Sequence, residues 1–155
     1  MNGYTLIDFT QFYRELIVCF GDKLILKKCL LEYHDENIAN AILMDINGSD
    51  HEMGKTFYDE EMQLFLMWMP HTPKTAQDMG FLSHEIFHAA CAIMGGIGSK
   101  LSDDSEEVFA YLITFLTQRI IEEFSISFSC GQEPESEQTQ LQSSPSLESS
   151  DSSEV

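Results

Sequence analysis

The chain has 155 residues, 43% apolar and 11% aromatic, which is enough for one hydrophobic core and predicts one domain. The net charge of −18, from 26 acidic and 8 basic residues, argues against nucleic-acid binding and against docking on anionic membranes, since both need clustered Lys and Arg. Four cysteines without CxxC pairing or a signal peptide indicate a cytoplasmic protein, and the absence of about 18 consecutive apolar residues predicts no membrane span.

The N-terminal part of the chain predicts a strand followed by a helix. Residues 14–20, RELIVCF, form a compact apolar run that ends at Gly-Asp, as a buried strand does. Asp22 can then cap a helix over residues 23–33, where apolar side chains recur at helical spacing.

The next segments predict two or three further strands. Residues 39–47 indicate a short strand that ends in an Asn-Gly turn, and residues 54–61 indicate another. Residues 62–69 are apolar apart from Gln63 and end at Pro70, which is typical of a strand buried on both faces.

Two long helices follow. The first runs from a possible N-cap at Thr75 to the Gly95-Gly96 pair and is apolar almost all round, which indicates a central helix. The second covers residues 104–124 with apolar residues at i, i+3, i+4, i+7 and i+11. The sequence therefore predicts an α+β fold, with a small mixed sheet packed against a pair of long helices.

The end of the chain differs in composition. Residues 129–155 hold six of the acidic residues, no Lys or Arg and no aromatic residue, so they cannot bury enough surface to fold. We expect a folded domain over residues 1–128 and a disordered acidic tail over residues 129–155.

The first long helix carries the pattern HExxH at His84, Glu85 and His88. On a helix, residues i and i+4 leave the same face, so both imidazoles can bind one Zn²⁺. Glu85 lies about 100° round the helix, where it can reach a metal-bound water as general base. The alternative is a chance match in which two core histidines are satisfied otherwise. The apolar surroundings favour the metal, because buried polar groups need a shared partner.

A catalytic zinc site needs a third protein ligand. No histidine follows His88, so this ligand must be a carboxylate or a cysteine. The acidic run DDSEE, residues 103–107, opens the second long helix. Glu107 lies on a polar stripe, Glu106 lies nearer the apolar side, and Glu107 could instead form a capping box with Asp104. Periodicity does not choose between the two glutamates.

The segments HEIFH and EEVFAYL together resemble the gluzincin-type metallopeptidases, which carry HExxH on one helix and an E-x-x-A motif on the next. The chain is most similar to small HExxH proteins encoded by phages and prophages. Glu107 stands three residues before Ala110, so the resemblance implies that Glu107 is the third zinc ligand. The resemblance spans about residues 62–124 and includes the strand LFLMWM, which looks like the family's active-site edge strand.

The resemblance implies zinc-dependent hydrolysis of a peptide or protein substrate, with Glu85 as the base, in the host cytoplasm if the chain is phage-encoded. Tyr111, one turn beyond Glu107, is a candidate to support a ligand histidine or to stabilise the oxyanion, and His71 and Tyr58 are further candidates for the oxyanion. Two alternatives stay open: a non-catalytic binding module that keeps the metal for structure, and an acidic interaction or decoy protein, as the charge of −18 suggests.

Overall fold

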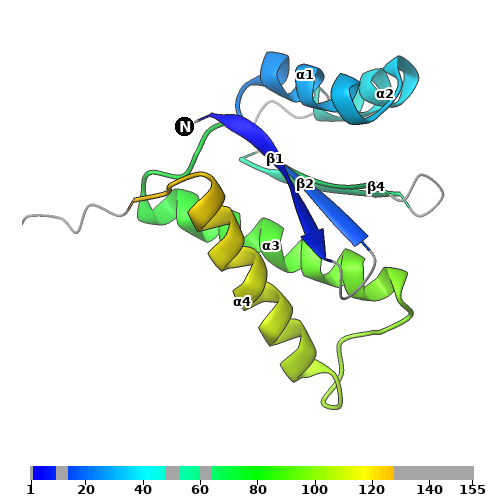
Figure 1. Ribbon diagram of the computed structural model, residues 1–155, viewed down its shortest axis with the longest axis vertical. Coiled ribbons are helices and arrows are strands. Elements are labelled where there is room, and N and C mark those ends of the chain that lie inside the picture. The colour runs from blue at the N-terminus through cyan, green and yellow to red at the C-terminus, as the bar shows by residue number, and fades with distance from the viewer. Residues whose placement is uncertain (1, 10–13, 48–52, 60–63, 128–155) are drawn as a thin grey trace, which may run out of the picture.

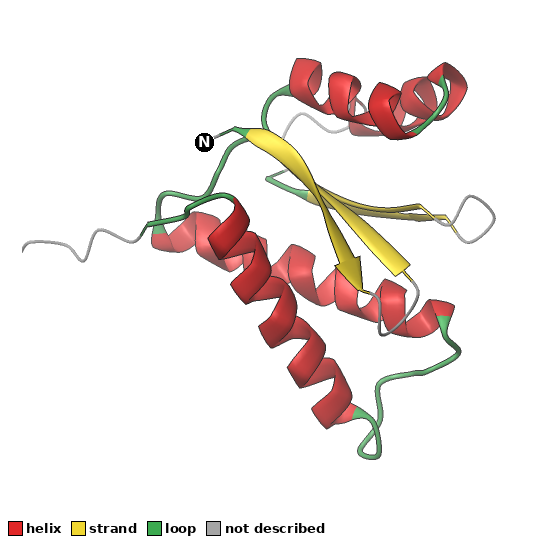
Figure 2. Cartoon of the chain, in the orientation of Figure 1, coloured by secondary structure: helices red, strands yellow, loops and turns green. Residues whose placement is uncertain are grey.

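The computed structural model describes residues 2–9, 14–47, 53–59 and 64–127. The elements in chain order are β1 (Gly3–Phe9), β2 (Arg14–Phe20), α1 (Lys23–Tyr33), α2 (Glu36–Asn47), β3 (Lys55–Asp59), β4 (Leu64–Met69), α3 (Ala76–Gly96) and α4 (Glu106–Glu123). Helices α1 and α2 cover one face of a four-stranded sheet, and α3 and α4 cover the other (Figures 1 and 2). The predicted α+β class is confirmed.

The strands lie in the order β1-β2-β4-β3. The central pair, β2 and β4, is parallel, whereas β1–β2 and β3–β4 are antiparallel, so the sheet is mixed as predicted. Every residue of β4 is buried, which confirms the prediction of a strand covered on both faces. The start of that predicted strand, residues 62 and 63, lies outside the described residues.

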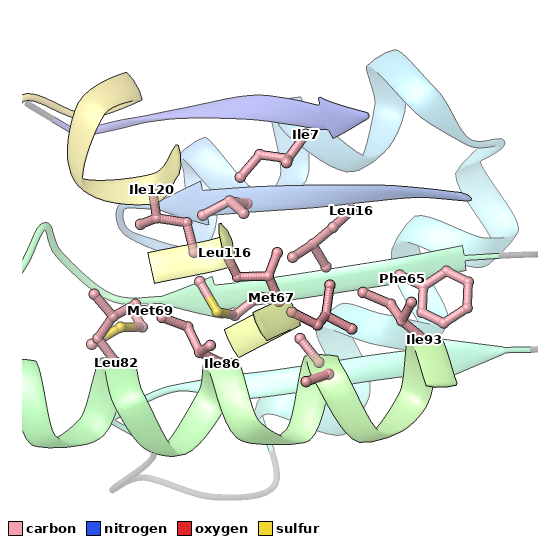
Figure 3. Close-up of a cluster of buried hydrophobic side chains, with 14 of the residues drawn as sticks. Ile7, Leu16, Phe65, Met67, Met69, Leu82, Ile86, Ile93, Leu116 and Ile120 are labelled. Atoms are coloured by element: carbon pink, nitrogen blue, oxygen red, sulfur yellow. The ribbon is translucent and has the colours of Figure 1, made fainter. Parts of the chain in front are cut away.

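Alternate residues of the central strands enter two separate cores, because successive side chains of a strand point to opposite faces. Figure 3 shows the core beneath α3 and α4, where Leu16, Met67 and Met69 of the sheet meet Ile86 and Ile93 of α3. The intervening residues of β2 and β4 pack against α1 and α2; they include Ile17, Cys19, Leu66 and Trp68.

The prediction of a strand over residues 39–47 is wrong, because this segment belongs to helix α2. Ala39, Ile42 and Ile46 are buried at the spacing i, i+3, i+7, which is one face of a helix. The short run AILM reads equally well as a strand, and the deciding signal is Asp35, whose Oδ1 accepts the N–H groups of Asn37 and Ile38 at 2.8 and 3.1 Å. Strand β1 was not predicted.

The expectation that LFLMWM is an edge strand is also wrong. The strand LFLMWM, β4, lies inside the sheet between β2 and β3, and the edge strand on this side is β3. Two further expectations concern the predicted acidic tail and the absence of a membrane span. The predicted tail, residues 129–155, lies outside the described residues. None of the helices in the described part of the chain is long and apolar enough to cross a membrane.

Candidate metal centre

Helix α3 carries the HExxH pattern and begins where the sequence predicts. The Thr75 side chain accepts the N–H of Asp78, and the Asp78 carboxylate accepts the N–H groups of Lys74 and Thr75 at 2.9 and 3.0 Å. These backbone donors, that of Lys74 foremost, hold the pKa of Asp78 below its ordinary value. This capping box fixes the first turn of α3 two turns before the motif.

The two histidines lie on the face of α3 that points away from the sheet. Leu82, Ile86 and Ala90 face the core, whereas His84 and His88 are exposed, so the expectation of two histidines buried in apolar surroundings is wrong. The helical repeat explains this, because positions 84 and 88 lie more than 100° from that buried stripe.

The imidazoles of His84 and His88 converge on one point. Their Nε2 atoms lie 3.0 Å apart, and the rings stand edge to face with centroids 4.6 Å apart. Two nitrogens bound at about 2.05 Å to one tetrahedral Zn²⁺ lie about 3.3 Å apart. Without a metal, a single proton shared between the nitrogens explains the same approach. The pair therefore fits two ligands of one zinc ion with little movement.

Glu85 leaves α3 on a different side, towards the edge strand. It is only 7% exposed, although it lies in the middle of a helix next to the exposed His84. Its Oε2 accepts a hydrogen bond of 2.8 Å from the Thr56 hydroxyl on β3. A Cβ at Gly54 would lie 2.9 Å from Glu85 Cγ, so the backbone of Gly54 covers this side chain directly.

The third ligand is not assembled with the histidine pair. Glu106 and Glu107 form the first turn of α4, and both side chains are exposed. Within residues 2–9, 14–47, 53–59 and 64–127, no three His, Cys, Asp or Glu side chains lie close enough together to form a ligand set. The geometry thus gathers two of the three predicted ligands.

The alternative role of Glu107 in a capping box with Asp104 is wrong. The N-cap of α4 is Ser105, one residue later, so Glu107 is the second residue of the helix and cannot be the third. Ser105 makes no side-chain cap to the helix, because its hydroxyl is bound to the loop, donating to Lys100 O at 2.6 Å and accepting Ser102 N–H at 3.0 Å. Glu107 is therefore not required for capping.

The other candidates, Tyr111, Tyr58 and His71, lie on three different segments and have local contacts or exposure of their own. Tyr111 is 72% exposed on α4, one turn beyond Glu107. Tyr58 stacks on Phe65 at a ring-centroid distance of 4.8 Å, and His71 Nδ1 lies 3.3 Å from Thr72 O in the loop before α3. Burial raises the pKa of the Cys91 thiol, which makes it a poor thiolate ligand.

Gly54 and Thr56 were not among the residues predicted from the sequence. Thr56 lies on β3, and Gly54 lies just before that strand, where its backbone also approaches Glu85 of α3. A Gly-x-Thr spacing is too common to signal a contact with Glu85 unless the sheet order is known, and the sequence placed β4 rather than β3 at the edge.

Comparison of the chain with protein-family models, with characterised proteins and with solved structures gave no significant match. The function is therefore argued from the geometry of the described residues.

Proposed function

We propose that the chain is a zinc-dependent peptidase in which His84, His88 and Glu107 hold the metal and Glu85 is the general base. The observation that carries the proposal is the convergence of the two Nε2 atoms to 3.0 Å beside a buried glutamate. A shared proton accounts for the histidine approach alone, but folding does not require a buried carboxylate in mid-helix beside that pair, whereas a metal site accounts for both features together.

Each residue has a distinct part in the proposed reaction. The zinc ion, when bound, supplies Lewis acidity towards water and the scissile carbonyl. Oε2 of Glu85 is engaged by Thr56, so Oε1 is the oxygen we assign to take a proton from the attacking water and deliver it to the leaving amine. Glu107 supplies the third donor from a helix that packs in the same core as α3.

The substrate in this proposal is an extended peptide that pairs with the outer edge of β3. An edge strand presents backbone donors and acceptors to an added strand. Strand β3 is the last strand on the side of the sheet where Glu85 lies, and Thr56 links the two directly. The proposal extends to a cytoplasmic setting, since the described cysteines Cys19, Cys29 and Cys91 are free thiols.

A second candidate function is a binding module in which the metal has only a structural role. The observation that favours it is the exposed Glu107, which the described structure does not bring to the histidine pair. Such a module has no need for a base at position 85, so Glu85 separates the two functions.

The experiment that tests the proposal begins with the zinc content of the purified full chain, measured by mass spectrometry after dialysis. The chain is then incubated with a proteome-derived peptide library, and new termini are identified. We expect one zinc per chain, and cleavage that is lost in Glu85→Gln but kept in Glu36→Gln, a matched change on the opposite face of the sheet. Zinc binding with undiminished cleavage by Glu85→Gln would refute the mechanism, and zinc binding without any cleavage would favour the binding module.

The third ligand is tested by two adjacent substitutions. Glu107→Gln is expected to weaken zinc binding at least about 10-fold, measured by competition with a chromophoric chelator, while Glu106→Gln leaves it near the wild-type value. The opposite ranking would assign the ligand to Glu106.

A further inference from the structure

Two residues at the start of the edge strand contact the proposed base: Thr56 lies in β3, and Gly54 directly precedes the strand. Thr56 Oγ1 lies 2.8 Å from Glu85 Oε2 and 3.2 Å from the Glu85 carbonyl oxygen. One hydroxyl has one proton, and the shorter distance assigns it to the carboxylate. The Gly54 backbone lies over the same side chain, since a Cβ there would meet Glu85 Cγ at 2.9 Å and Met69 Cγ at 3.2 Å.

These two contacts restrict the conformations that the Glu85 side chain can adopt. The side chain is 7% exposed and lies between α3 and the inner face of β3. A glutamate has three rotatable side-chain bonds, and a mobile base would seldom face the attacking water. The Thr56 hydroxyl is bound to Oε2, and the Gly54 backbone lies against the side chain. Together they determine that Oε1 is the oxygen directed away from the strand.

We infer that Thr56 is a positioning residue for Glu85, with Gly54 providing the space in which the carboxylate is held. The inference rests on the proposed function, because it gives that base its orientation. It also accounts for a partly buried threonine on β3 and a glycine just before that strand, both of which contact Glu85.

The variants are chosen to separate the hydroxyl from the shape of the side chain. Thr56→Val removes the hydroxyl and keeps the branched shape, whereas Thr56→Ser keeps the hydroxyl. Thr117→Val is the matched control, because this partly buried threonine donates only to Ile113 O of its own helix, at 2.7 Å. Gly54→Ala adds a methyl group against Glu85, and Gly3→Ala, where a Cβ would meet nothing within 4 Å, is its control.

The first measurement does not need metal or turnover. In the metal-free chain labelled with ¹³C at glutamate carboxyl carbons, the resonance lost in Glu85→Gln belongs to Glu85. We expect Thr56→Val to move this resonance and Thr56→Ser and Thr117→Val to leave it in place. An unmoved resonance in Thr56→Val would overturn the inference whether or not the chain is a peptidase.

The second measurement uses a peptide that the wild-type chain cleaves in the library. We expect Thr56→Val to lower kcat by about 10- to 100-fold with little change in KM or in zinc affinity, since misplacement of a catalytic group by about 1 Å can cost that much. Gly54→Ala is expected to lower kcat likewise. Thr56→Ser is expected to restore most of the rate. Equal losses in Thr56→Val and Thr56→Ser would overturn the inference, whereas a wild-type chain that cleaves nothing would instead count against the proposed function.

Discussion

The two faces of the sheet differ in what they bury. On the side of α1 and α2, the core is apolar, and its buried side chains are those of residues such as Leu26, Leu30 and Ala39. The described chain buries three polar or charged residues, Thr72, Asp78 and Glu85, and the last two belong to α3 on the other face. One face is thus an apolar support, and the other carries side chains whose burial has an energetic cost.

The polar residues of the second face are not alike. Asp78 is explained by folding, because it receives two backbone N–H groups at the start of its own helix. Glu85 lies in mid-helix, where it caps nothing, and its side-chain bond comes from another element, β3. A buried carboxylate that the helix does not need is typical of a functional residue, and this difference separates Asp78, which folding explains, from Glu85, the proposed base.

The largest expected effect comes from His84 and His88, the two residues on the second face that are proposed to bind zinc. His84→Ala or His88→Ala removes one of two converging nitrogens and is expected to weaken zinc binding by at least about 100-fold, measured by chelator competition. His71→Ala, in the loop before α3, is the control and should bind zinc as the wild type does. Wild-type affinity in both His84→Ala and His88→Ala would show that the histidine pair does not bind the zinc.

The next prediction tests how much the apolar core under α1 and α2 contributes to stability. Leu30→Ala, in a fully buried position of α1, is expected to lower the free energy of unfolding by about 2–5 kcal/mol. Leu31→Ala, at the neighbouring position that is 45% exposed, should cost much less. Urea unfolding measures both. Zinc affinity of the folded Leu30→Ala chain should be unchanged, and a parallel loss of affinity would show that the two faces are coupled through the sheet.

A smaller effect sharpens the contrast between Asp78 and Glu85. Thr75→Ala removes the cap of α3 and is expected to lower the free energy of unfolding by about 1 kcal/mol.

The pKa of Asp78 is held below its ordinary value of 3.8 by backbone donors. The stabilisation from this carboxylate is therefore complete above pH 3.8 and is lost as pH falls through the lower pKa of the folded state.

The measurement for Asp78 is the urea midpoint as a function of pH. The difference in midpoint between the wild type and Asp78→Asn should shrink as the solution is acidified below about pH 4. A difference that grows in acid would mean that the carboxylate is not stabilised in its charged form.

The sequence predicted what depends on local patterns. The sequence predicts the HExxH helix from Thr75 to Gly96 because an N-cap and a glycine pair bound a long segment that is apolar almost all round, and it predicts β4 from a continuous apolar run. The segment 39–47 was misassigned because four consecutive apolar residues fit either period, and only the cap at Asp35 decides. Strand order has no local signal, so β3 could not be identified as the edge strand.

The candidate site also has residues that a local pattern predicts and a contact that it does not. The two histidines follow from a four-residue spacing on one helix, and the structure brings their nitrogens together. The contact of Thr56 with Glu85 joins residues 29 apart on different elements, and it depends on strand order and on the depth at which α3 packs. Such contacts arise from tertiary packing and are not encoded by any single motif.

The smallest expected effect concerns the exposed charges at the end of α4. Arg119 pairs with Glu122 and Glu123 at 3.4 and 2.6 Å, and all three side chains are well exposed. Solvent-exposed ion pairs of this kind contribute about 0.3–0.5 kcal/mol, so Arg119→Ala should barely shift the urea midpoint, and less still in high salt. Ile120→Ala, at the adjacent buried position, should cost about 2–5 kcal/mol. A loss above about 1.5 kcal/mol in Arg119→Ala would mean that charge holds this end of α4. A negligible loss would show that this end of α4 is held by apolar burial, as the first face of the sheet is.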